Sequence, residues 1–249
     1  MATDQTDLKL VEAIRTRYNG IRRRMDDAAT SAGRDPGSVH LIAVTKFFPA
    51  AVAAAACAAG LTDLGENRVQ EMLAKQAELT GMGLTPRWHL IGTLQKNKVR
   101  QVMGRTSLIH SGDSLDLLAE ISRRSVAAGL ISRVLLQINP AGEETKHGFL
   151  LAEFGAAAKA AVLLPGLQID GIMAMAPLLT DPSETLPFFK LSASAFDTLC
   201  EIFQQLKPDE QLPSILSMGM SEDFPQAIAC GATHIRIGTA LFGPRPFPV

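Results

Sequence analysis

The sequence predicts an α/β protein of 249 residues that folds as a single (β/α)8 TIM barrel, with one domain over 1–249. Three observations predict this fold. Short apolar runs rich in β-branched residues alternate with longer helical patterns, eight such runs occur, and nearly every gap between them has room for a helix. Buried strands that alternate strictly with helices pair in parallel. A doubly wound open sheet is the alternative, but it normally has fewer strands and often a glycine-rich first turn, and no GxGxxG motif occurs here.

The expected elements follow one another along the whole chain, and no linker, low-complexity run or repeat marks a second domain. A charged amphipathic segment over 7–32 should form an extra helix packed outside the barrel. The strands are expected at 40–45, 62–65, 89–92, 108–110, 134–139, 169–175, 215–217 and 234–238. The helices are expected at 52–59, 68–79, 115–127, 153–163, 188–205 and 222–229.

Composition and charge argue against several classes of protein. A formal net charge of −1 gives no electrostatic case for binding nucleic acid or a membrane surface, and the basic run 22–24 fits a solvated helix face. Cys57, Cys200 and Cys230 form no CxxC pair and the histidines have no metal-site spacing, so neither a disulfide scaffold nor a metal site is expected. The N-terminus lacks the apolar core of a signal peptide, and the apolar run 50–61 is too short to span a bilayer. These features indicate a soluble cytoplasmic protein.

The first strand ends in LIAVTKFFP, which places Lys46 where barrel enzymes carry their active sites. Burial lowers the pKa of a lysine because it disfavours the charged form, and the neutral amine can attack an aldehyde to form a Schiff base. The alternative is a lysine that reaches the surface past Phe47. The first strand alone favours this alternative.

The last strand changes that balance. Side chains alternate along HIRIG, so His234, Arg236 and Gly238 share one face, and the two isoleucines between them share the other. Arg236 should therefore point into the barrel. Closure of the barrel places the eighth strand beside the first, which makes Arg236 and Lys46 neighbours. Two neighbouring cations lower the pKa of the lysine and require an anion or acceptor between them.

The loops after the seventh and eighth strands, SMGMSEDFPQAI and RIGTALFG, can provide a phosphate site, as these loops often do in barrels. In the first loop, Ser217, Gly219 and Ser221 offer hydroxyls and close backbone approach, although Ser221 could equally be only the cap of the following helix. In the second loop, Gly238 and Thr239 offer backbone amides and a hydroxyl. A lysine, an arginine and phosphate donors together describe a site for pyridoxal 5′-phosphate (PLP).

The chain resembles the pyridoxal phosphate homeostasis proteins, also called the YggS/PROSC family. The matching motifs cover nearly the whole chain in order: LIAVTKF, LGENRVQE, WHLIGTLQKNK, INPAGEETKHGF, GIMAMAP and LSMGMSEDFPQAIACGATHIRIGTALFG. The family's fold is similar to the barrel domain of alanine racemases, without their second β domain. The resemblance implies a role in vitamin B6 homeostasis.

The resemblance also implies roles for individual residues. Lys46 would hold PLP, Arg236 would face the pyridine nitrogen, and Asn67 and His89 would line the site. The phosphate would be surrounded by Ser217, Gly219, Gly238 and Thr239. The structural alternatives are a helix cap for Asn67 and a core histidine for His89.

Other residues in the family motifs have less definite roles. Glu143 and Lys146 match a motif whose role does not follow from the sequence. Met173 and Met175 are expected to pack the barrel rather than contact the cofactor.

The predicted site favours binding over catalysis. An arginine donor leaves the ring nitrogen unprotonated, which makes the cofactor a poor electron sink. Alanine racemases share this arginine but use a tyrosine from another domain as a second base, whereas this chain has one tyrosine, Tyr18, in the outer helix. We therefore expect a monomeric, non-catalytic carrier or buffer of PLP, with PLP-dependent apoenzymes as recipients. A racemase is the second hypothesis, and a class I aldolase is the third, although its lysine usually lies on a later strand and GIMAM contains none.

Overall fold

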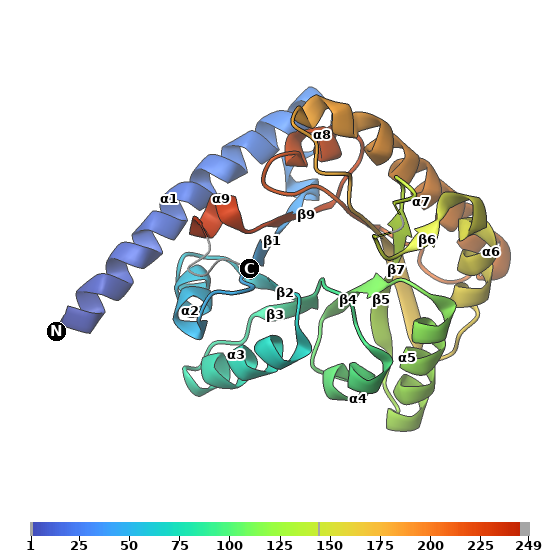
Figure 1. Ribbon diagram of the computed structural model, residues 1–249, viewed down its shortest axis with the longest axis horizontal. Coiled ribbons are helices and arrows are strands. Elements are labelled where there is room, and N and C mark those ends of the chain that lie inside the picture. Colours follow the sequence, from blue (N-terminus) through green and yellow to red (C-terminus); the bar gives the residue numbers. More distant parts are fainter. Residues whose placement is uncertain (1, 144, 245–249) are drawn as a thin grey trace.

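The eight apolar runs form eight parallel strands that close into a barrel, in a computed structural model that describes residues 2–143 and 145–244 (Figure 1). Around the barrel the strands follow chain order, and the first pairs with the last. The predicted (β/α)8 barrel is confirmed. Its strands are β1 (His40–Val44), β2 (Asp63–Glu66), β3 (Arg87–Leu90), β4 (Leu108–Gly112), β5 (Ser132–Asn139), β7 (Leu167–Ala174), β8 (Ile215–Ser217) and β9 (His234–Ile237). A two-residue strand, β6 (Phe149–Leu150), pairs with the end of β5 and was not expected.

Helices fill the gaps between the strands and cover the outside of the barrel (Figure 1). The outer helix expected over 7–32 is α1 (Ala2–Ser31), which packs against α2, α8 and α9 and buries Ile14, Ile21 and Met25. The other helices are α2 (Ala50–Ala58), α3 (Val69–Gly81), α4 (Val99–Val102), α5 (Leu115–Ala128), α6 (Leu151–Val162), α7 (Leu186–Leu206), α8 (Phe224–Ala229) and α9 (Thr239–Phe242). Short 3-10 turns cover Pro36–Ser38, Lys96–Lys98 and Pro182–Thr185. Within the described residues, no helix combines the length and the apolar character needed to cross a bilayer.

The third strand lies two residues earlier than expected, and this shift affects the site. It was expected at 89–92, but β3 covers Arg87–Leu90, because its parallel ladder with β2 begins at the pair Asp63 and Arg87. Residues 91–93 therefore follow the strand and line the cavity at its carboxyl end. His89 lies within the strand instead of at its start.

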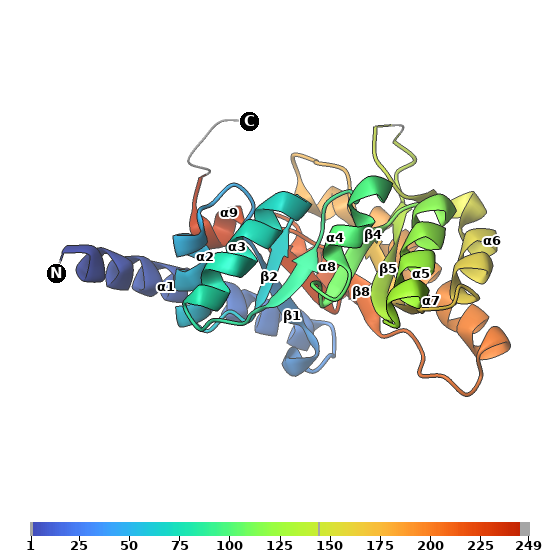
Figure 2. The same cartoon turned by 90° about the horizontal axis from the view of Figure 1, so that it is seen from below.

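The barrel interior contains both apolar and polar side chains. A small apolar cluster inside the sheet consists of Leu108, Leu135, Met173 and Ile215, with Met175 packed against it. The predicted packing role of Met173 is thus confirmed, whereas Met175 packs against the cluster and also lines the cavity at the carboxyl ends of the strands. In the side view, the loop between β5 and β6 projects beyond the ends of the strands (Figure 2). This loop stands at the end where the candidate site lies.

Candidate functional site

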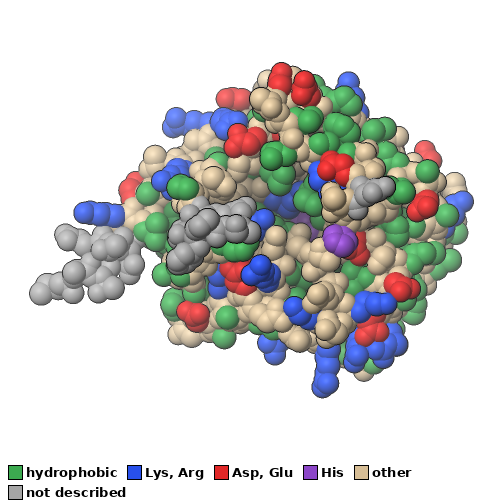
Figure 3. All heavy atoms as spheres, in the orientation of Figure 1, with side chains coloured by type: hydrophobic (Ala, Val, Ile, Leu, Met, Phe, Trp, Pro, Cys, Tyr) green, Lys and Arg blue, Asp and Glu red, His purple; other side chains and the backbone are tan. Residues whose placement is uncertain are grey.

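A cavity of about 490 Å³ lies at the carboxyl ends of the barrel strands. Its walls come from residues in or after β1, β2, β3, β5, β7, β8 and β9, so every barrel strand except β4 contributes to it. The space-filling view from this end shows a hollow with basic side chains in it (Figure 3). The cavity volume is within the range of about 300–1,000 Å³ that is usual for small-molecule sites.

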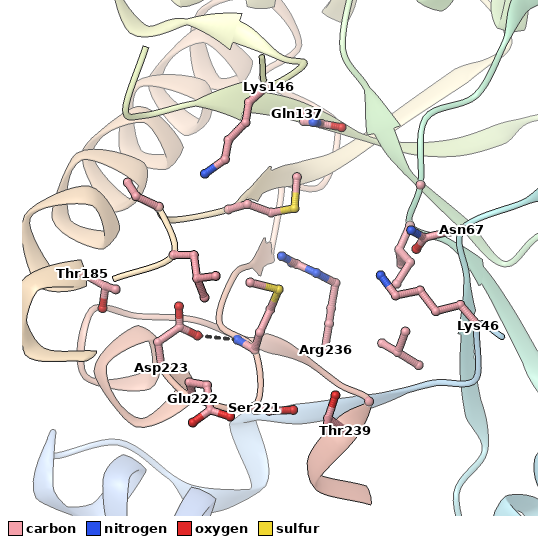
Figure 4. A pocket seen from close by; sticks show the side chains of 18 of the residues that line it. Lys46, Asn67, Gln137, Lys146, Thr185, Ser221, Glu222, Asp223, Arg236 and Thr239 are labelled. Atoms are coloured by element: carbon pink, nitrogen blue, oxygen red, sulfur yellow. Dashed lines mark hydrogen bonds between the residues drawn. The ribbon is translucent and has the colours of Figure 1, made fainter. Parts of the chain in front are cut away.

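Lys46 and Arg236 both line this cavity. Lys46 follows β1 and is half-buried, and its side chain extends into the cavity toward Arg236, near Asn67 (Figure 4). The register explains the pairing, since β1 and β9 are neighbours and Ile42 lies opposite Arg236. The structure therefore brings together the two cations that the sequence predicted to be neighbours.

The turn that carries Lys46 is held by a buried ionic cluster. Lys75 of α3 donates from Nζ to the Thr45 carbonyl at 2.7 Å, to Glu66 Oε1 at 2.6 Å and to Glu71 Oε1 at 3.0 Å. Glu71 Oε1 also accepts from the backbone N–H of Phe47 at 2.7 Å. Phe47 has a φ of 69°, in the left-handed region that non-glycine residues rarely adopt. The cluster thus fixes a strained backbone next to Lys46.

Arg236 is anchored below the cavity by two hydrogen bonds. Its Nη1 donates to Ser217 Oγ at 2.8 Å, and its Nη2 donates to the Ala174 carbonyl at 3.0 Å. Burial lowers the pKa of Arg236 to about 10, with the negative charge of Asp223 opposing the shift. The guanidinium therefore remains protonated at neutral pH and acts only as a donor.

Hydroxyl groups and a glycine line the cavity beside β9. Ser221, Gly238 and Thr239 all contribute to its wall, and Ser221 Oγ accepts from the Ala240 N–H at 3.4 Å. At Gly238, an added Cβ would approach other protein atoms no closer than 3.4 Å, so packing within the protein does not by itself require glycine there. Asp223 also lines this side, and its Oδ1 accepts from the Met220 N–H at 2.6 Å.

The structure does not place Ser217 or Gly219 on the cavity wall. Ser217 is fully buried and its hydroxyl lies inside the barrel, where it accepts from Arg236. Gly219 is backed against α8, and an added Cβ would lie 2.6 Å from the Ala227 Cβ. Both residues lie behind the residues that line the cavity, whereas the sequence predicted that they would contact a phosphate.

Gly219→Ala is expected to destabilise the protein by about 2–3 kcal/mol, because φ is 92° there and the new methyl group would clash with α8. Urea unfolding measures the effect. Gly155→Ala in α6 is the matched control, since an added Cβ there meets nothing within 4 Å and a helical alanine should stabilise by up to about 1 kcal/mol. If the two variants had equal free energies of unfolding, the predicted clash between an alanine at position 219 and α8 would be wrong.

Asn67 lines the cavity as expected, but the structure does not bring His89 to it. His89 is buried inside the barrel, where its Nε2 lies 3.0 Å from Asp63 Oδ1 and its Nδ1 lies 3.0 Å from His110 Nε2. It lines a separate cavity of about 210 Å³, together with residues from the amino-terminal ends of the strands. The position favours the alternative of a core histidine.

The partly buried His234 should make stability depend on pH. Burial, with the nearby rings of His40 and His89, lowers the pKa of His234 to about 3. The unfolded chain binds a proton at His234 below about pH 6.5 whereas the folded chain does not, so acid favours unfolding by up to about 1.4 kcal/mol per pH unit. In His234→Asn, the slope of the unfolding free energy against pH should therefore be smaller by about this amount between pH 6 and 4.5. An unchanged slope in His234→Asn would refute the assignment.

Lys146 lines the cavity from the loop between β5 and β6. Its Nζ donates to Glu143 Oε1 at 2.9 Å and to the Ala176 carbonyl at 3.3 Å, while Asn139 Nδ2 donates to the Glu143 carbonyl at 2.8 Å. Glu143 thus holds the loop and the lysine; Glu144 of the same motif lies outside the described residues. Lys146 is thus a second amine at the cavity, held in an ion pair with Glu143.

Several site residues were not predicted from the sequence. Gln137, Asp223 and the ionic cluster of Glu66, Glu71 and Lys75 had no assigned role, although a glutamate that is buried at the end of a strand needs a buried partner. Within the described residues, no group of three or more His, Cys, Asp or Glu side chains could hold a metal ion. The cavity thus offers an amine, a buried guanidinium and hydroxyl donors, which suit a small ligand with an aldehyde, an acceptor atom and an anionic group.

Known proteins share this sequence and fold. The alanine racemase N-terminal domain family matches residues 12–246. The pyridoxal phosphate homeostasis proteins of Pseudomonas aeruginosa and Aquifex aeolicus are 41% and 38% identical, over 91% and 93% of this chain and 94% and 98% of theirs. PipY of Synechococcus elongatus with PLP bound is 39% identical with a TM-score of 0.77, and the match covers 92% of this chain and 100% of that one. The chain belongs to the pyridoxal phosphate homeostasis protein family, within the family of the alanine racemase N-terminal domain.

Proposed function

We propose that this chain binds PLP for vitamin B6 homeostasis and holds it as a Schiff base on Lys46. The observation that carries the proposal is that Lys46 and the buried Arg236 reach one cavity from neighbouring strands. The names of the relatives and the PLP bound to PipY support the same ligand. We also propose that residues 1–249 form one PLP-binding domain that works as a cytoplasmic monomer.

The residues around the cavity fit the three functional parts of PLP. The Lys46 amine suits the aldehyde, the Arg236 N–H groups suit the ring nitrogen, and the Ser221 and Thr239 hydroxyls beside Gly238 suit the phosphate. When bound, PLP supplies an electrophilic carbonyl carbon and a ring that can accept electrons. The Lys46 amine attacks a carbonyl in its neutral form.

The same residues support a carrier or buffer rather than an enzyme. Arg236 stays protonated at neutral pH and donates, so the ring nitrogen remains an acceptor and the ring withdraws electrons weakly. Tyr18 lies on α1, packed against the core, and is not among the described residues that line the cavity. The racemase alternative is therefore not favoured. Apoenzymes that require PLP are the recipients we propose.

Absorbance spectroscopy and peptide mapping test the proposal. The protein is incubated with PLP, its spectrum is recorded, and borohydride then reduces any Schiff base to a stable adduct. We expect a visible band that borohydride removes, with the added mass on the peptide that contains Lys46. An adduct on Lys146 instead would reject Lys46 as the attachment site, and the absence of any band would reject PLP as a covalent ligand.

A further inference from the structure

A continuous chain of hydrogen bonds runs through the barrel from the cavity to its opposite end. Arg236 Nη1 lies 2.8 Å from Ser217 Oγ, which lies 3.1 Å from His110 Nδ1. His110 Nε2 lies 3.0 Å from His89 Nδ1, and His89 Nε2 lies 3.0 Å from Asp63 Oδ1. Ser217 and His110 are fully buried, and His89 and Arg236 are each 5% exposed. Water therefore has little access to the links of this chain.

The two ends of the chain have fixed hydrogen-bonding roles. Arg236 can only donate. Although burial acts to raise the pKa of Asp63, hydrogen bonds from Arg87 and His89 hold it below its usual value, so the carboxylate only accepts. A cation therefore stands at the cavity end and an anion stands at the far end.

With both histidines neutral, these ends leave one arrangement of protons between them. His89 then donates from Nε2 to Asp63, so its Nδ1 accepts from His110 Nε2–H. His110 is neutral, because burial lowers its pKa well below 6.5, so its Nδ1 accepts from the Ser217 hydroxyl. The Ser217 oxygen then accepts from Arg236. The reverse order requires a doubly protonated His89. Ser217 Oγ would then accept from both His110 and Arg236, and its own O–H would have no acceptor in the chain.

We propose that Asp63, His89, His110 and Ser217 are positioning residues that hold the Arg236 guanidinium in the orientation that serves the ligand's ring nitrogen. The carbonyl of Ala174 fixes the other terminal nitrogen, so the guanidinium has two anchors below the cavity. The inference rests on the proposed function for its ligand. It assigns a ligand-binding effect to Asp63, which lines the separate cavity at the other end of the barrel and not the ligand cavity.

Two variants and their combination test the chain on the PLP-loaded protein. Asp63→Asn allows the amide to turn its NH2 toward His89, and Ser217→Ala removes the link next to Arg236. Each should shift the visible band in the same direction and weaken PLP binding about three- to tenfold, as expected for the net contribution of one hydrogen bond. The double variant should be no worse than the more affected single variant, because both act through one chain.

Asp116→Asn is the matched control for Asp63→Asn. It makes the same substitution in the exposed pair with Lys96, away from the hydrogen-bond chain and from the ligand cavity, so its spectrum and affinity should equal those of the unaltered protein. Additive effects in the double variant, or an Asp63→Asn protein with an unchanged band and affinity, would overturn the proposal. If Asp63→Asn does not fold, His89→Gln replaces it with the same expectations.

A second measurement needs no PLP. Nitrogen-15 NMR of labelled histidines in the ligand-free protein should show His89 and His110 as neutral Nε2–H tautomers at pH 7. Any other tautomer at either ring would overturn the chain. This result is independent of the ligand. If the protein shows these tautomers but does not bind PLP, the proposed function is wrong and the hydrogen-bond chain is still supported.

Discussion

Lys46→Ala should abolish the borohydride-stable PLP adduct while the barrel remains folded. The side chain extends into the cavity from the end of β1, so its removal deletes the proposed attachment point. Because Lys46 is only half-buried, the free energy of unfolding without PLP should change by less than about 1 kcal/mol. PLP should still bind, more weakly and reversibly, through Arg236 and the hydroxyl groups. Mass spectrometry after reduction measures the adduct, and urea unfolding measures the stability.

Two lysine variants control for this experiment. Lys146→Ala removes the other amine that lines the cavity and should keep the adduct at full yield. Lys159→Ala removes an exposed lysine on α6 and should change neither adduct nor stability. If Lys46→Ala still forms the adduct in full, the attachment point lies elsewhere and the proposed role of Lys46 is wrong.

The pairing of Lys46 with Arg236 could be predicted because it depends on two robust features of the sequence. Alternation in HIRIG determines which side chains point inward, and closure of an eight-stranded barrel makes the last strand a neighbour of the first. Both are properties of local pattern and strand count. Neither requires knowledge of how individual side chains pack.

The depth of a side chain along the barrel axis could not be predicted in the same way. Ser217 and His89 both point inward, but they lie below the cavity, in the hydrogen-bond chain to Asp63. Depth depends on the stagger between strands, and the two-residue shift of β3 changed it for His89. The sequence pattern identified inward-facing polar residues but did not separate those that line the cavity from those that support it.

The ionic cluster under the Lys46 turn shows a second limit. Glu66 and Lys75 come from β2 and α3, and their pairing depends on the angle at which the helix packs on the strand. No periodicity encodes such a contact. Its sequence signal is a charged residue at the end of an expected barrel strand, which indicates that a partner exists without identifying it.

Lys75→Met should lower the free energy of unfolding by about 3–5 kcal/mol, because it leaves the Glu66 carboxylate buried without its cation. The side chains of Lys75 and Glu66 are 5% and 0% exposed, and Glu66 Oε2 already has no hydrogen-bond partner. Burial also raises the pKa of Glu66, so the variant can take up a proton there and should lose less stability at pH 5 than at pH 8. Urea unfolding at the two pH values measures both effects.

Restoring charge balance should recover much of this loss. Lys75→Met combined with Glu66→Gln removes both buried charges and should be more stable than Lys75→Met alone by about 2 kcal/mol or more. Lys96→Met breaks the exposed pair with Asp116 and should cost less than about 1 kcal/mol. Because Lys75 also donates to the Thr45 carbonyl, the double variant should still hold the Lys46 turn less firmly and form the PLP adduct more slowly. A Lys75→Met protein with unchanged stability would show that the buried ion pair contributes no net stability to the fold.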